Sequence, residues 1–179
     1  MEEKKFNLIF GDSITAMKQL IENGIKVDMI LCDLPYGTTA CSWDAVIPFA
    51  PLWDCYKQLI KENGAIVLFG SQPFTTDLIM SNREWFKYEI IWEKERPTNP
   101  LLCNKQILKY HENIVLFCEG QPTYNPQKPR KKDVNKRKNK ARAYITETIG
   151  DKPIYSDMCL AGEKEFIYPA SIQYFPMER

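Results

Sequence analysis

The stretch VDMILCDLPY, residues 27–36, decides the fold of this chain. Its first six residues, 27–32, form an apolar run of the length expected for a buried strand. Asp33 follows directly, at the carboxyl end of that strand, where open α/β sheets bind their ligands. The stretch therefore predicts an α/β fold with a binding site that begins at Asp33.

The tetrapeptide Asp33-Leu34-Pro35-Tyr36 can bind a flat base that carries an exocyclic amine. The Asp33 carboxylate and the Leu34 carbonyl can each accept one hydrogen of the amine, which draws electron density toward its nitrogen. Pro35 restricts the turn, and the Tyr36 ring can stack on a base that has left the duplex. These residue types predict methylation of an amino group in nucleic acid. For four isolated residues, the alternative is an acidic turn after a buried strand.

Strands and helices alternate along the chain, as a largely parallel sheet requires. We expect strands at 6–10, 27–32 and 65–69. We expect helices from Asp12 or Ser13 to Asn23-Gly24, over 47–60 with a stop at Asn63-Gly64, and through Leu78-Ile79. Two further strands, 88–92 and 113–118, have no clear helix between them, which predicts an antiparallel finish.

Composition excludes several classes of protein. A chain of 179 residues with 44% hydrophobic content suits one globular domain with an insertion. No run approaches the ~18 apolar residues of a membrane span, and MEEKKFNLIF lacks the pattern of a secretory signal, so we expect a soluble, intracellular protein. The six cysteines lack CxxC spacing and His111 is the only histidine, which argues against a metal site or a disulfide framework. We interpret His111 as a strand-edge residue.

The net charge of +1 hides a basic segment at 128–142. Prolines introduce this segment and oppose regular structure there. Nine basic side chains face the single acid Asp133, and they are Lys128, Arg130, Lys131, Lys132, Lys136, Arg137, Lys138, Lys140 and Arg142. Such a cluster suits a phosphate backbone and would bind it with strong salt dependence, while a solvated loop is the alternative.

The order of these segments resembles the β-type amino methyltransferases of DNA, the adenine methylases of restriction-modification systems and phages. GDSITAMKQL resembles the opening segment of the family, VDMILCDLPYGTTACSWD its catalytic motif, and NGAIVLFGSQPF and KYHENIVLF its later core strands. Only a permuted arrangement places the catalytic motif so early, which separates this chain from unpermuted protein and RNA methylases. The resemblance implies a Rossmann-like sheet, S-adenosylmethionine as cofactor, DNA as substrate, and the cytoplasm of a bacterial or phage-infected cell.

The resemblance also implies roles for individual residues. Asp33 would orient the target amine and contact the cofactor, Leu34 and Pro35 would supply backbone acceptors, and Tyr36 would stack on the base. Asp12 would contact the adenine of the cofactor, although a helix cap explains it equally well. Ser71, Gln72, Pro73 and Phe74 would line the base pocket, with a helix-start turn as the alternative. Trp43 and Asp44 match a family pattern too, and we interpret them as a buried anchor.

Two departures from the family pattern matter. Leu34 stands where a proline is usual, which loosens the turn. After residues 168–172 the family continues into a His-Pro-x-Gln-Lys-Pro helix and an Asp-Pro-Phe-x-Gly-x-Gly turn, whereas this sequence stops at Arg179. None of its eight glycines makes a GxG after a strand, so the backbone cradle for the methionine half of the cofactor is missing. We therefore expect an incomplete sheet with an exposed apolar edge.

Residues 1–94 and 110–119 form the expected catalytic core, and 95–109 with 120–170 form an insertion that we predict to recognise DNA. The leading hypothesis is N6-adenine methylation by the amino-terminal part of an enzyme, completed by a second polypeptide that carries the glycine-rich motif. An acid in the first motif position favours adenine in the family. The alternatives are a truncated, inactive remnant that binds DNA, N4-cytosine methylation, and a non-catalytic RNA-binding module.

Overall fold

The apolar run before Asp33 forms strand β1, Val27–Asp33, and Asp33 is its last residue. The computed structural model describes residues 6–127 and 168–175. The chain divides into two units, Met1–Tyr124 with Ser171–Arg179, and Asn125–Ala170. Nearly all described residues belong to the first unit, and the fold below is that of this unit. The predicted division into core and insertion stays a prediction.

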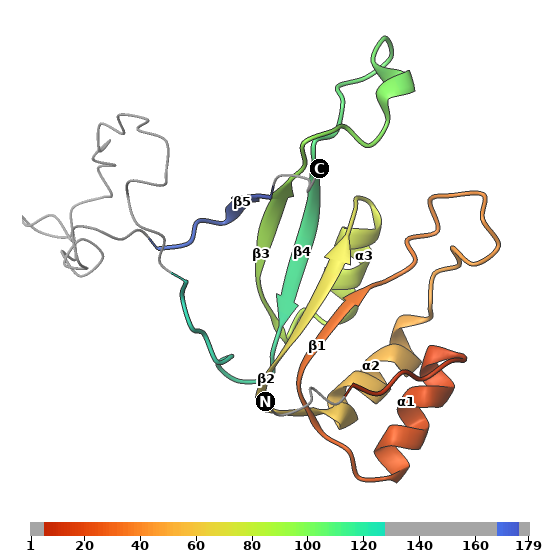
Figure 1. Cartoon of the computed structure of the whole chain (residues 1–179), viewed down its shortest axis with the longest axis vertical. Coiled ribbons are helices and arrows are strands. Elements are labelled where there is room, and N and C mark those ends of the chain that lie inside the picture. Colours follow the sequence, from red (N-terminus) through yellow and green to blue (C-terminus); the bar gives the residue numbers. More distant parts are fainter. Residues whose placement is uncertain (1–5, 128–167, 176–179) are drawn as a thin grey trace, which may run out of the picture. The chain divides into compact units, whose positions relative to one another are not determined.

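A single five-stranded sheet organises this unit, with the strand order β1-β2-β4-β3-β5 (Figure 1). Its other strands are β2 Ile60–Gly70, β3 Phe86–Glu93, β4 His111–Phe117 and β5 Ile172–Tyr174. β1 is parallel to β2, and β5 is parallel to β3. β4 is antiparallel to both of its neighbours, so the predicted antiparallel finish is confirmed.

The described part of the chain contains three α-helices. α1 is Ser13–Glu22, α2 is Phe49–Leu59 and α3 is Phe74–Ser81, while a short 3-10 helix, η1 Pro100–Leu102, lies between β3 and β4. α1 precedes β1, whereas α2 and α3 lie between consecutive strands. Asp12 caps α1 by accepting from the Thr15 N–H at 2.9 Å, as its residue type predicts. The predicted stop of α2 at Asn63-Gly64 is wrong, because the backbone is already extended at Ile60, where β2 begins.

The predicted strand at 6–10 is not formed. Its apolar side chains are exposed instead, with Phe6 at 90% and Phe10 at 103% of full exposure. A strand needs a neighbour that satisfies its backbone hydrogen bonds. β1 lies at the edge of the sheet and pairs with β2 alone among the described strands. Residues 6–10 therefore have the residue pattern of a strand, but no described strand provides their backbone with hydrogen-bond partners.

One face of the sheet carries the core. Ile66 and Leu68 of β2 and Val115 and Phe117 of β4 are fully buried on this face. Figure 1 shows α2 and α3 behind the sheet in this view, and Trp53 of α2 packs its ring edge-on against Phe117, with the ring centres 4.8 Å apart. Burying this apolar surface supplies most of the driving force for folding.

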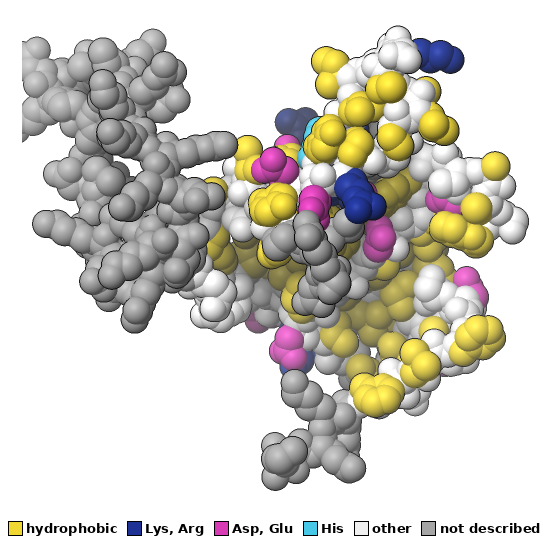
Figure 2. Space-filling view, turned by 45° about the horizontal axis from the view of Figure 1, so that its top comes forward, with side chains coloured by type: hydrophobic (Ala, Val, Ile, Leu, Met, Phe, Trp, Pro, Cys, Tyr) yellow, Lys and Arg dark blue, Asp and Glu magenta, His cyan; other side chains and the backbone are white. Residues whose placement is uncertain are grey.

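The opposite face is apolar but largely uncovered, and we call it the open face. It comprises Met29, Leu31, Val67, Phe69, Tyr88, Ile90, Ile114 and the buried Leu116, which alternate with the core residues along β1 to β4. Met29 is 51% exposed, Leu31 61% and Tyr88 42%. Figure 2 shows hydrophobic side chains across much of the visible described surface. Parallel strands are normally covered on both faces, whereas on this face Met29, Leu31 and Tyr88 remain exposed among the described residues.

None of the helices within 6–127 and 168–175 has the length and apolar character needed to cross a bilayer.

Candidate active site

The site is built at the edge of the sheet where β1 and β2 end. Asp33 closes β1 and is exposed, and the Tyr36 hydroxyl donates to its Oδ1 at 2.6 Å. Partial burial and the nearby Asp33 carboxylate raise the pKa of Tyr36 far above its ordinary value of 10.0, so the hydroxyl stays protonated. A carboxylate offers about four acceptor positions, so Asp33 can accept a further hydrogen bond from an amine.

The Tyr36 ring is held by the segment that follows β2. Its centre lies 5.2 Å from that of Phe74, which is the first residue of α3 and only 4% exposed. Phe74 in turn contacts the Phe49 ring of α2 at 5.7 Å. The structure therefore brings the tetrapeptide and the 71–74 segment together, while the predicted role of 71–74 in a base pocket stays a prediction. Within that segment Gln72 and Pro73 are exposed, and Gln72 accepts from the Thr76 hydroxyl.

Leu34 anchors the tetrapeptide in the core. Its side chain is 5% exposed and belongs to the main hydrophobic cluster, while Pro35 next to it is half-buried. Burial of the Leu34 side chain thus restrains the turn at a position where a proline ring would restrain it in the family that the sequence resembles. The predicted acceptor role of the Leu34 carbonyl stays a prediction.

A buried carboxylate organises the loop that follows Tyr36. Asp44 is 8% exposed and accepts from the backbone N–H groups of Gly37 at 2.9 Å, Thr38 at 2.9 Å and Thr39 at 2.7 Å. The Thr39 hydroxyl and the Gly37 N–H lower the pKa of Asp44 to about 2. Asp44 is therefore the anchor that we predicted. Trp43 is 72% exposed, so its interpretation as part of a buried anchor is wrong.

Asp12 lies at the start of α1. Besides the N–H of Thr15, its Oδ1 accepts from the Thr15 hydroxyl at 2.8 Å, and these two bonds lower the pKa of Asp12. The helix cap is thus formed. The side chain is exposed and ionised, so its second oxygen can also accept from a ligand.

Sequence reasoning missed a set of charged residues at the same edge. The Lys109 Nζ donates to the Ser71 Oγ at 2.6 Å, and desolvation lowers the pKa of Lys109. The Lys94 ammonium pairs with the Glu112 carboxylate, and the strand register places Glu112 at the edge of the sheet where β1 and β2 end. Lys109 lies two residues before β4 and Glu112 is the second residue of that strand, and charged residues beside an apolar run were the available signal.

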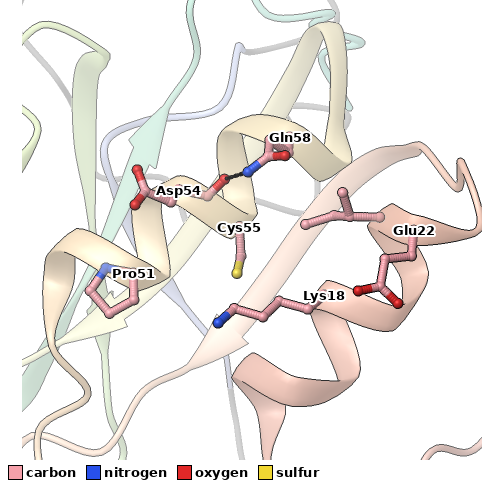
Figure 3. A pocket seen from close by; sticks show the side chains of 7 residues that line it. Lys18, Glu22, Pro51, Asp54, Cys55 and Gln58 are labelled. Carbon is pink, nitrogen blue, oxygen red and sulfur yellow. Dashed lines mark hydrogen bonds between the residues drawn. The ribbon is translucent and has the colours of Figure 1, made fainter.

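A separate pocket lies between α1 and α2, away from the tetrapeptide (Figure 3). It encloses about 310 Å³ and is lined by Lys18, Ile21, Glu22, Pro51, Asp54, Cys55 and Gln58. The Gln58 side chain donates to the Asp54 carbonyl at 2.9 Å. This mixed, partly charged lining suits a solvated cleft, and none of the predicted site residues lines it.

Other predicted residues stand as follows. His111 is exposed at the first position of β4. The basic segment at 128–142 lies outside the described residues. Within the described part of the chain, no group of three or more His, Cys, Asp or Glu side chains could hold a metal ion.

Comparison with solved structures identifies the fold. The complex of M1.HpyAVI, a DNA methyltransferase, with SAM superposes with a TM-score of 0.53 at 21% identity, over 68% of this chain and 58% of that chain. M1.HpyAVI itself gives 0.51 at 21% identity, over 66% and 58%. This chain therefore shares the mixed α/β, Rossmann-like fold of these structures. The cytosine-N4-specific PvuII DNA methyltransferase gives 0.46 at 9% identity over 94% and 56%, too weak a likeness to carry an argument. No protein-family model and no curated protein matches the chain.

The chain spans 58% of the length of the M1.HpyAVI structures that it matches. The residues present fit S-adenosylmethionine only in part. Asp33 at the end of β1 and Asp12 at the start of α1 both offer exposed carboxylates, which suit the polar groups of an adenosine. The sequence contains no GxG motif, whose glycines would let the backbone approach the methionine half.

Proposed function

We propose that this chain is the base-binding part of an S-adenosylmethionine-dependent DNA methyltransferase that modifies the exocyclic amine of adenine. The observation that supports this most is the arrangement of Asp33, Tyr36 and Phe74 at the carboxyl end of β1. It combines a hydrogen-bond acceptor for an amine with an aromatic ring supported from behind. Both are placed where sheets of this class bind ligands.

Each residue has a defined task in this proposal. Asp33 accepts a hydrogen of the target amine, which orients the nitrogen lone pair toward the methyl donor. Tyr36 stays protonated and holds the Asp33 carboxylate through its hydroxyl, while its ring stacks on the extruded base. The bound cofactor supplies the electrophilic methyl group. The acid in the first motif position is our reason for preferring adenine to cytosine.

We also propose that a second polypeptide supplies the glycine-rich part of the cofactor site. The open face and the edge of β1 support this. The open face is apolar and a helix would cover it, while the β1 edge, which no described strand pairs with, offers backbone groups to an additional strand. The exposed residues 6–10 support it too, since their side chains suit a strand and no described strand pairs with them.

The test has three steps. Calorimetry should show no micromolar binding of S-adenosylmethionine to the chain alone, and micromolar binding would refute the need for a second polypeptide. Affinity purification of the tagged chain from its native cells should then recover a protein with the glycine-rich turn. The mixture should transfer tritiated methyl groups to duplex DNA, and mass spectrometry of the nucleosides should find N6-methyladenine. N4-methylcytosine would overturn the choice of base, and no transfer would favour an inactive DNA-binding remnant.

A further inference from the structure

Trp43 is exposed in a way that the other tryptophans are not. All four lie in the described part of the chain: Trp53 is 5% exposed, Trp85 is 7% exposed and Trp92 is half-buried, whereas Trp43 is 72% exposed. Burying a side chain as large as tryptophan is strongly favourable, so a tryptophan left in water at a fixed position calls for a binding partner.

The position of Trp43 is fixed by the loop that carries it. The next residue, Asp44, is buried and binds three successive backbone N–H groups at 37–39, and the Asp44 N–H donates to the Cys41 carbonyl at 3.0 Å. Gly37 has φ +68°, and a Cβ there would lie 2.9 Å from the Val46 side chain. The loop therefore has a defined conformation that presents Trp43 outward.

The same hydrogen bonds place Trp43 beside the candidate active site. Gly37, which Asp44 binds, follows Tyr36 directly, and Tyr36 binds Asp33. The Trp43 side chain thus projects into solvent next to Asp44, the residue that holds the loop against the tetrapeptide. A duplex that has lost one base from its stack exposes the faces of the neighbouring bases, and aromatic side chains stack on such faces.

We propose that Trp43 stacks on the nucleobases beside the extruded one and stabilises the opened DNA. This rests on the proposed function, since it requires DNA at the tetrapeptide. Trp43 is then a positioning residue: it contacts the substrate next to the reacting base and leaves the chemistry to Asp33. Stacking is generally worth about 1–3 kcal/mol per base, so losing it weakens binding by about 5- to 150-fold.

The experiment uses the fluorescence of the intact chain. Because Trp43 is the most exposed tryptophan, it should dominate quenching by acrylamide. A fluorescein-labelled 20-base-pair duplex with one adenine opposite an abasic site supplies an easily extruded base. On binding this DNA, the wild-type chain should lose emission and become less accessible to acrylamide. Trp43→Phe should bind within about threefold of wild type without either signal, and Trp43→Ala should bind about tenfold more weakly.

Met80→Ala is the matched control, because Met80 is 63% exposed on α3 and should leave affinity and fluorescence response unchanged. If wild type binds the duplex while its acrylamide quenching is unaltered, or if Trp43→Ala binds as tightly as wild type, the role of Trp43 is refuted and the proposed function stands. If wild type binds no DNA, the proposed function falls and the role of Trp43 falls with it. Circular dichroism of each variant checks that the fold is kept.

Discussion

Two leucines on opposite faces of the same strand pair test whether the open face is truly open. Leu31 of β1 is 61% exposed and lies opposite Val67, whereas Leu68 of β2 is fully buried and lies opposite Cys32. Leu68→Ala should lower the free energy of unfolding by about 2–5 kcal/mol, because it removes buried methyl groups and leaves a cavity. Full burial of a leucine is worth about 1.5–3 kcal/mol, so Leu31→Ala, with about two-fifths of the side chain covered, should cost about 1 kcal/mol or less.

Urea denaturation followed by circular dichroism measures this difference. With a slope of about 2 kcal/mol/M, the Leu68→Ala midpoint should fall by about 1–2.5 M, and the Leu31→Ala midpoint by about 0.5 M or less. The slopes should match that of wild type, since neither change alters what unfolding exposes. Equal losses for the two variants would refute the reasoning, because they would mean that Leu31 is covered when the chain is in solution.

Three further predictions concern the site. In the enzyme reconstituted with its second polypeptide, Asp33→Ala should lower the rate of methyl transfer by at least about a hundredfold, while DNA affinity stays within about twofold of wild type. A wild-type rate of methyl transfer would remove Asp33 from the mechanism. The ionised Asp44 carboxylate stabilises its loop fully above pH 4, and this stabilisation is lost as the pH falls toward the lowered pKa of about 2. The NMR chemical shifts of the 37–39 amides should therefore titrate near pH 2 in wild type and stay constant with pH in Asp44→Asn. A titration midpoint at the ordinary 3.8 would contradict the role of Asp44 as the anchor of the loop. Replacing the nine basic side chains at 128–142 by serine should weaken DNA binding and flatten its dependence on salt by about 0.9 in log–log slope per lost phosphate contact, and an unchanged slope would exclude those contacts.

The sequence predicted best those features that depend on neighbouring residues. The apolar run before Asp33 became β1, and Asp12 became a helix cap, because both depend on local periodicity and capping chemistry. The strand at 6–10 failed for the opposite reason: its period was right, but a strand needs a partner that local sequence cannot supply. β5 was not predicted, because three residues are too few to show a period.

Parts of the candidate site were beyond prediction for a similar reason. Ser71 and Lys109 are 38 positions apart, and only the pairing of β2 with β4 brings their side chains together. Trp43 has the residue type of a core anchor, and only the tertiary packing of Asp44 shows that its indole ring is left outside. The tetrapeptide was found because its four residue types, taken together, are suited to one kind of chemistry.

The attachment of the 125–170 unit has a consequence for how such a protein can change over time. On one side the Thr123 N–H donates to the Asn63 carbonyl, and on the other the Ser171 carbonyl accepts from the Ile91 N–H, just before β5 pairs with β3. Both ends are thus fastened to the same sheet at fixed points. Because these points lie on β2 and β3 and not on the residues around Asp33, evolution can exchange or enlarge the stretch between them while Asp33 and its neighbours keep their geometry.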